Sequence, residues 1–229
     1  MTTASVNSTA VKPASRRPAR KKVRRGRPKD AGLQERRCEE ILCRASRVFA
    51  EMGYQNADVQ VVADALSISK GTVYRYFPTK EKLFLAAIER GVRCLDQHMI
   101  SARATEPDPL KQIEVMIRAY LAFFEKHPQL AELFVQERAE FRSRKKSIYF
   151  EVKEEAQDSC REMTEALIAT GRVRNMPVER ITGVMGDLLY GTMFTNFLTG
   201  RRRPHEDQAR DILDVVLNGI LSDAERKKK

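Results

Sequence analysis

The sequence contains no tryptophan and only three histidines, and it lacks an apolar run long enough to cross a membrane. It also lacks a phosphate-binding loop, a G-x-S-x-G nucleophile motif and an H-E-x-x-H metal motif. The histidines, His98, His127 and His205, lie far apart along the chain. These absences argue against an enzyme, so we expect no catalytic residue, no cofactor and no membrane partner.

Cysteine is scarce, and no two cysteines form a C-x-x-C pair. The four are Cys38, Cys43, Cys94 and Cys160. Scattered cysteines of this kind are typical of reduced thiols in an intracellular protein. The N-terminus lacks the apolar segment of a secretion signal, which favours a cytoplasmic location. Cys94 and His98 have a spacing that suits two metal ligands on a helix, but no third ligand is evident, so we expect no metal site.

Positive charge is concentrated at the N-terminus. The net charge is +11; residues 1–30 hold ten basic residues and one acidic residue, a net +9, which leaves +2 for the remainder. Residues 1–30 are rich in Ala, Ser and Pro without apolar periodicity, so we expect a disordered basic arm. Such an arm attracts a polyanion such as nucleic acid.

One segment of this arm, Arg25-Gly26-Arg27-Pro28, resembles the core of an AT-hook. That resemblance implies that Arg25 and Arg27 enter the narrow minor groove of A·T-rich DNA, where negative potential is concentrated. A basic tail without groove preference is the alternative. Nuclear targeting is a third interpretation, which requires a eukaryotic source.

Two short helices are predicted on either side of a tight turn. Residues 59–66 have apolar residues at helical spacing, and Asp58 is a suitable N-cap. Ser69 is a second N-cap, and Pro78 ends the helix that follows it. A helix, a short turn and a second short polar helix form the helix-turn-helix plan, in which the second helix enters the major groove.

The segment from Ile41 to about Phe84 resembles the N-terminal DNA-binding domain of the TetR family of transcriptional regulators. The matching residues are Ile41, Ala45, Phe49, Gly53, Tyr54, Val62, Ala63, the run 69–77 and the run 80–84. The resemblance implies an all-α fold with a three-helix DNA-binding domain over 31–80, the motif lying at about 58–77. It also implies a helical bundle over 81–229 for ligand binding and dimerisation.

The same resemblance assigns contacts with double-stranded DNA to side chains of the second short helix. These are Lys70, Thr72, Tyr74, Arg75 and Tyr76. The resemblance also assigns Lys80 a contact with the DNA backbone. The positive charges of Lys70, Arg75 and Lys80 suit phosphate oxygens independently of the resemblance. Gly71 permits close approach of backbone to DNA, whereas Val73 and Phe77 are expected to face inward.

The chain departs from the family pattern at three positions. It has Ala57 and Asp58 where the family usually has Thr-Ser, and Ser67 where the family has Gly. Loss of the hydroxyl at Ala57 removes one expected phosphate contact. Asp58 places a negative charge near the DNA backbone unless capping occupies it, and Ser67 must adopt a turn conformation that Gly adopts more easily.

Proline, glycine and apolar periodicity predict the other helices. The expected spans are 34–52, 80–101, 109–126, 128–142, 147–170, 177–199 and 206–223. The 177–199 helix is apolar on more than one face and contains Gly183, Gly186 and Gly191. Together with 206–223 it is the predicted homodimer interface; a central helix of a monomeric core is the alternative.

A small-molecule site is expected within the bundle, because bundle cores can hold apolar pockets with a few polar groups. The candidate ligand-binding residues are Phe124, Phe134, Tyr149, Met163, Asp187, Tyr190, Phe194 and Asn196. Such residues are also common in a plain core. The sequence does not name the effector.

We therefore predict a TetR-type transcriptional regulator that acts as a repressor. A small and largely apolar effector is expected to release it from a palindromic operator. One alternative is an architectural DNA-binding protein dominated by the basic arm. Another is a helical-bundle enzyme or carrier with a vestigial DNA-binding head.

Overall fold

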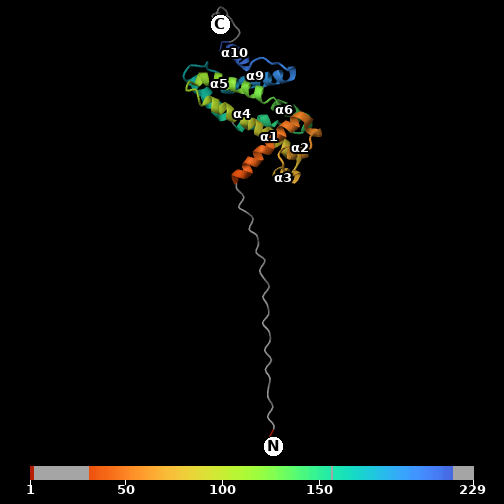
Figure 1. Cartoon of the computed structure of the whole chain (residues 1–229). Helices are drawn as coiled ribbons and strands as arrows, with labels where there is room; N and C mark the ends of the chain where they lie inside the picture. Colours follow the sequence, from red (N-terminus) through yellow and green to blue (C-terminus); the bar gives the residue numbers. More distant parts are fainter. Residues whose placement is uncertain (3–30, 156, 219–229) are drawn as a thin grey trace, which may run out of the picture.

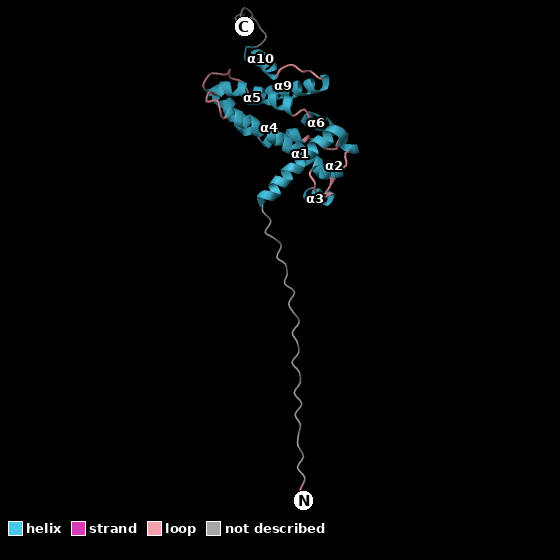
Figure 2. Cartoon of the chain, viewed as in Figure 1, coloured by secondary structure: helices cyan, strands magenta, loops and turns pink. Residues whose placement is uncertain are grey.

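The computed structural model describes residues 1–2, 31–155 and 157–218, and every regular element in these ranges is a helix (Figure 2). The all-α prediction is confirmed. The elements are α1 (Ala31–Asn56), α2 (Val59–Ala65), α3 (Lys70–Tyr76), α4 (Lys80–Arg103), α5 (Pro109–Lys126), α6 (Gln129–Glu140), α7 (Ile148–Glu155), α8 (Gln157–Ala169), α9 (Val178–Thr199), α10 (His205–Leu213) and a π-helical turn η1 (Asp214–Asn218). Arg25 and Arg27 lie outside the described residues.

The short helices α2 and α3 lie at one end of the molecule, and α9 and α10 lie at the other (Figure 1). Helix α4 packs against both α1 and α5 and so joins the two ends. Its side chains Phe84, Ile88, Val92 and Leu95 are fully buried. One continuous apolar cluster extends from α1–α3 to α10. No helix in the described ranges has the length and apolarity that a membrane span requires.

Four helices begin at a side-chain N-cap, and two of these caps are the predicted Asp58 and Ser69. The side chains of Asp58, Ser69, Thr79 and Asp108 each accept a hydrogen bond from a backbone N–H two or three residues later. These bonds satisfy donors that have no partner within the first helical turn. The starts of α2, α3, α4 and α5 are therefore fixed by local sequence.

The first and last predicted helices differ from those observed. The first helix extends over Ala31–Asn56 rather than 34–52; the predicted stop at Gly53 is a kink inside it, with φ 76° and ψ 154°. The predicted helix over 147–170 corresponds to α7 and α8, and residue 156 between them is outside the described ranges. The last predicted helix, 206–223, is α10 followed by η1, and residues beyond 218 are outside the described ranges.

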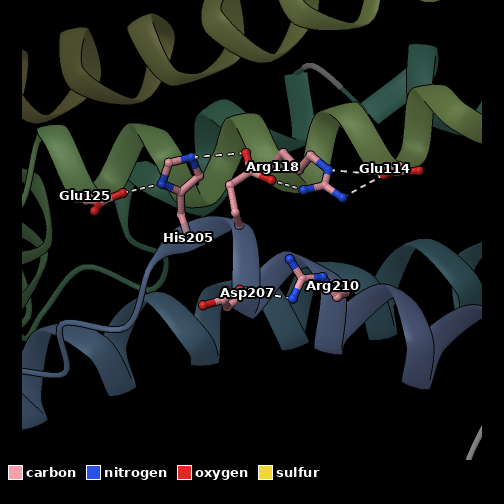
Figure 3. A network of polar contacts seen from close by, with 7 residues as sticks. Glu114, Arg118, Glu125, His205, Asp207 and Arg210 are labelled. Atoms are coloured by element: carbon pink, nitrogen blue, oxygen red, sulfur yellow. Dashed lines mark hydrogen bonds and ion pairs between the residues drawn. The ribbon is translucent and has the colours of Figure 1, made fainter.

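Ion pairs hold α10 against α5 (Figure 3). Arg118 contacts Glu114 on its own helix at 2.7 Å and also pairs with Glu206 of α10. The His205 ring contacts Glu125 through Nδ1, and its Nε2 lies 3.4 Å from Glu206. These contacts supplement the apolar packing that fixes α10 beside α5.

Candidate DNA interface

The turn between α2 and α3 is set by backbone hydrogen bonds. The Ile68 N–H donates to the Ala63 carbonyl at 3.0 Å, and the Ser67 N–H donates to the Asp64 carbonyl at 3.0 Å. Ser67 has φ 52°, the left-handed conformation expected from its place in the turn. This turn fixes the angle at which α3 leaves α2.

Helix α3 has one buried face and one exposed face. Val73 is fully buried and Phe77 is 9% exposed, as expected for residues that anchor the helix. Gly71, Tyr74 and Arg75 are exposed on the opposite face. A short helix of this kind depends on tertiary packing for its stability, and Val73 and Phe77 provide that packing.

Lys70 and Asp58 form an ion pair across the motif. The Lys70 ammonium lies 2.6 Å from Asp58 Oδ1, and the same oxygen accepts the N–H of Gln60 at 2.8 Å. The hydrogen bond from Gln60, followed by that from Lys70, lowers the pKa of the Asp58 carboxyl. The carboxylate of Asp58 thus caps α2 and at the same time holds the first side chain of α3.

Sequence reasoning predicted the cap at Asp58 but missed its contact with Lys70. The available signal was the opposite charge at the starts of two adjacent helices. Ala57, where the family has a hydroxyl residue, is only 3% exposed. Its methyl group packs in the head and is not part of a DNA-facing surface.

Two other α3 side chains take part in local contacts. The hydroxyls of Thr72 and Ser69 lie 2.9 Å apart, which places the Thr72 side chain beside the cap. The Arg75 guanidinium lies 5.6 Å from the centre of the Tyr76 ring. Tyr76 is half-buried and packs against the core. Tyr74, at 37% exposure, is the tyrosine more available to a ligand.

Lys80 takes part in an internal contact at the start of α4. Its ammonium donates to the Gln55 carbonyl at 2.9 Å and lies 5.0 Å from the centre of the Tyr54 ring. Lys80 therefore joins the end of α1 to the start of α4. The predicted contact of Lys80 with a DNA phosphate stays a prediction, and the ammonium that would make it is engaged with Gln55 in this structure.

Five of the eight predicted ligand-binding residues form one cluster of rings whose neighbouring centres lie 4.8 to 6.5 Å apart: Phe124, Phe134, Tyr149, Tyr190 and Phe194. Phe134, Tyr190 and Phe194 line one open cavity, and Met163 lines a different one. Phe124 and Tyr149 are buried in the core, where the Tyr149 and Tyr120 hydroxyls lie 3.3 Å apart. Asn196 donates to Gln208 at 2.6 Å, and Asp187 is exposed on α9. Phe134, Tyr190 and Phe194 thus share a cavity, and the role of all eight candidates in ligand binding stays a prediction.

The structure also bears on the metal prediction. In the described ranges no three His, Cys, Asp or Glu side chains gather closely enough to hold a metal ion. Cys94 is half-buried, and the His98 ring packs 5.8 Å from the Phe123 ring. In this structure the side chains of Cys94 and His98 therefore take part in packing around α4.

Comparison with known sequences identifies the family that the helix-turn-helix region, called the head below, resembles. Residues 41–87 match the family of bacterial regulatory proteins called the tetR family. The chain carries a TetR-family N-terminal domain. The match includes part of α1, all of α2 and α3, and the start of α4. The TetR-family resemblance inferred from the motif is thereby confirmed.

Two curated relatives extend the comparison. The transcriptional activator FasR of Mycolicibacterium smegmatis is 32% identical over 123 residues, which is 53% of this chain and 54% of FasR. The nucleoid occlusion factor SlmA of Haemophilus ducreyi is 29% identical over 84 residues, which is 37% of this chain and 42% of SlmA. The chain thus matches about half the length of these relatives.

Structural similarity to known proteins also extends beyond the TetR-family head. A transcriptional regulator FadR of Bacillus subtilis, solved in complex with stearoyl-CoA, superimposes with a TM-score of 0.69. That superposition covers 80% of this chain and 99% of FadR at 16% identity. At this identity the likeness concerns the fold, which is shared by the head and the helical bundle.

Proposed function

We propose that the chain is a TetR-type transcriptional regulator that binds a near-palindromic operator as a homodimer. The observation that carries this proposal is the exposed face of α3, with Tyr74 and Arg75 held outward by the buried Val73 and Phe77. In the helix-turn-helix plan this face enters the major groove. Arg75 suits a guanine edge or a phosphate, and Tyr74 suits a phosphate oxygen.

We assign DNA binding to 31–80 and ligand binding and dimerisation to 81–229. Support for a dimer comes from α9, whose residues Val184, Asp187, Gly191, Thr195 and Leu198 are exposed along one stripe. Val184 is 60% exposed and Leu198 is 69% exposed. The spacing of three and four residues places them on one helical face.

The glycines of α9 add to this support. A methyl group at Gly183, Gly186 or Gly191 would meet no atom of the chain within 4 Å. Packing within the chain therefore does not require small residues there, whereas close approach of a second helix does. Two α9 helices from two copies, together with α10, would form a two-fold interface.

Effector response is the second part of the proposal. A small, largely apolar effector would bind the bundle and favour a spacing of the two heads that no longer fits the operator, a population shift driven by differential affinity. We propose that the protein represses transcription while it is bound to the operator. FadR of Bacillus subtilis, which shares this fold, was solved in complex with stearoyl-CoA, and this supports ligand binding by a protein of this fold.

Substitutions on α3 test the DNA-binding proposal directly. Arg75→Ala and Tyr74→Ala should weaken binding to the selected operator more than binding to random DNA, with a loss of about 1–3 kcal/mol for a base-contacting arginine. Arg174→Ala, at an exposed arginine outside the head, is the matched control. Equal operator affinity for Arg75→Ala and Arg174→Ala would overturn the assignment.

A further inference from the structure

An open cavity of about 820 Å³ lies where α6, α7 and α9 meet. Its aromatic residues are Phe134, Phe150, Tyr190 and Phe194. The Tyr190 ring lies 4.8 Å from Phe194 and 5.0 Å from Phe150, centre to centre. Phe150 is 40% exposed although it sits among other aromatic rings. The cavity size is within the range of about 300–1,000 Å³ typical of small-molecule sites.

Four basic side chains also line this cavity. Arg138, Arg142, Lys145 and Lys146 lie at the end of α6 and in the connector to α7, and Glu154 is the acidic residue among the lining side chains. Lys146 pairs with Glu154. We call the remaining three cations, Arg138, Arg142 and Lys145, the basic rim.

The basic rim has no acidic partner in the part of the chain that the structure describes. Arg142 donates only to the Ala139 carbonyl, at 3.3 Å, and the other two cations form no ion pair there. Beside them, the Ser147 hydroxyl is buried and makes no hydrogen bond with described residues. Three cations and one free hydroxyl thus adjoin an aromatic surface.

We propose that this cavity binds an amphiphilic anion: an apolar chain on the aromatic rings, and a carboxylate or phosphate on the basic rim. The inference rests on the proposed function and defines its effector more narrowly, since a purely apolar effector would leave the rim cations unused. Hydrogen bonds between arginine and a carboxylate or phosphate are among the stronger polar contacts in proteins. A second copy of the chain is a less suitable occupant, because it would bring an equally basic rim.

The position of the site on α6 connects it to the DNA-binding head. On the other side of this helix, the buried Gln136 side chain donates to the Phe49 carbonyl of α1 at 2.9 Å. Glu140 accepts a hydrogen bond from Gln55, at the end of α1. An anion that draws Arg138 and Arg142 together acts on the helix that packs directly against α1.

Calorimetric titration of the full chain tests the site with three probes of equal chain length: dodecanoic acid, dodecyl phosphate and dodecan-1-ol. We expect the two anions to bind about tenfold more tightly than the alcohol. The stronger of the two anions identifies the head group. Equal binding of the alcohol, or no binding of either anion, would overturn the proposal.

Two variants locate the binding. Arg138→Gln combined with Arg142→Gln should lower the affinity for the more tightly bound anion about tenfold and leave the affinity for the alcohol unchanged. Both residues are exposed, so the fold should tolerate the change. Arg174→Gln, outside the cavity lining, is the control and should change nothing. Phe150→Ala should lower the affinity for every probe that binds. An unchanged anion affinity in the double variant would remove the basic rim from the site.

Operator binding, measured on the same samples, separates this inference from the proposed function. Intact operator binding without anion binding refutes the site and leaves the DNA-binding function standing. Anion binding that depends on the rim but never alters operator affinity supports the site and refutes effector-controlled release. Conversion of the dimer to a monomer by Phe150→Ala would show that a second copy covers the cavity, which also refutes the site.

Discussion

At the residue scale, Lys70 stands at the start of α3 with its ammonium on the carboxylate that caps α2. The pair is exposed, so its contribution to stability is small. Its effect on binding is a separate matter, because DNA must compete with Asp58 for Lys70. Asp58 also presents a negative charge to approaching phosphates.

Asp58→Asn should therefore raise DNA affinity a few-fold while it preserves the cap, since asparagine is as good an N-cap as aspartate. Release of Lys70 for one further phosphate contact should steepen the dependence of log affinity on log salt by about 0.9. Fluorescence anisotropy over a salt series measures both quantities.

Asp64→Asn is the matched control, because Asp64 is an exposed carboxylate on α2 that contacts Gln60 and not Lys70. It removes the same charge without releasing the lysine. Identical salt slopes for the two variants would show that Lys70 does not move from Asp58 to DNA.

Much of the head was predictable at this scale, and the Asp58–Lys70 contact was not. Capping depends on neighbours in sequence, so Asp58, Ser69 and Thr79 could be assigned from residue type alone. The contact with Lys70 depends on the angle between α2 and α3. That angle follows from the positive φ of Ser67, a value that residue type does not dictate.

At the scale of elements, α6 is a second helix, besides α4, that connects the two ends of the molecule. It packs on α1 and on α9. Phe141, just after α6, packs 5.1 Å from the Tyr54 ring of α1 and 5.8 Å from the Phe84 ring of α4, centre to centre. A shift of α6 is thus transmitted to the head through both aromatic and polar contacts.

The hydrogen bond from Gln136 to Phe49 is the buried polar part of this contact. Gln136→Ala removes the amide and part of the packing, and should destabilise the protein by about 1–3 kcal/mol. Urea unfolding monitored by circular dichroism measures the loss. Gln129→Ala, in the first turn of the same helix, should stay within about 0.5 kcal/mol; a similar loss in both variants would deny the Gln136 contact a special role.

Element boundaries were predicted best where proline or a capping residue marks them. Asp108 with Pro109 set the start of α5, and Pro128 separated α5 from α6. The prediction for α1 was wrong at both ends. Helix geometry resumes for three residues after Gly53, where Tyr54 packs against Phe49 and Phe84. This tertiary packing overrides the local stop signal.

At the scale of the whole molecule, paired heads require a dimer. Gly191→Glu should convert the dimer to a monomer without loss of helicity, because the site is open within the chain and glutamate favours a helix more than glycine does. Sedimentation equilibrium measures the mass and circular dichroism checks the fold. A folded Gly191→Glu variant that remains dimeric would exclude this face of α9 as the interface.

The cavity could be predicted only in part, because its residues come from segments far apart in sequence. Phe134, Tyr190 and Phe194 were identified as ligand-binding candidates. The basic connector was visible in the sequence as a run of charge, but its place beside those rings depends on how α6, α7 and α9 pack. Phe124 and Tyr149, two further candidates, are buried in the apolar cluster and their rings pack against Phe134.

The most direct measurement is selection of bound duplexes from a random pool by the full-length chain at physiological salt. Paired α3 helices predict an enriched palindrome whose half-sites are about one helical turn apart, or a multiple of it. A form lacking residues 1–29 should recover the same palindrome. No enriched sequence, or enrichment that disappears with residues 1–29, would contradict operator recognition through α3.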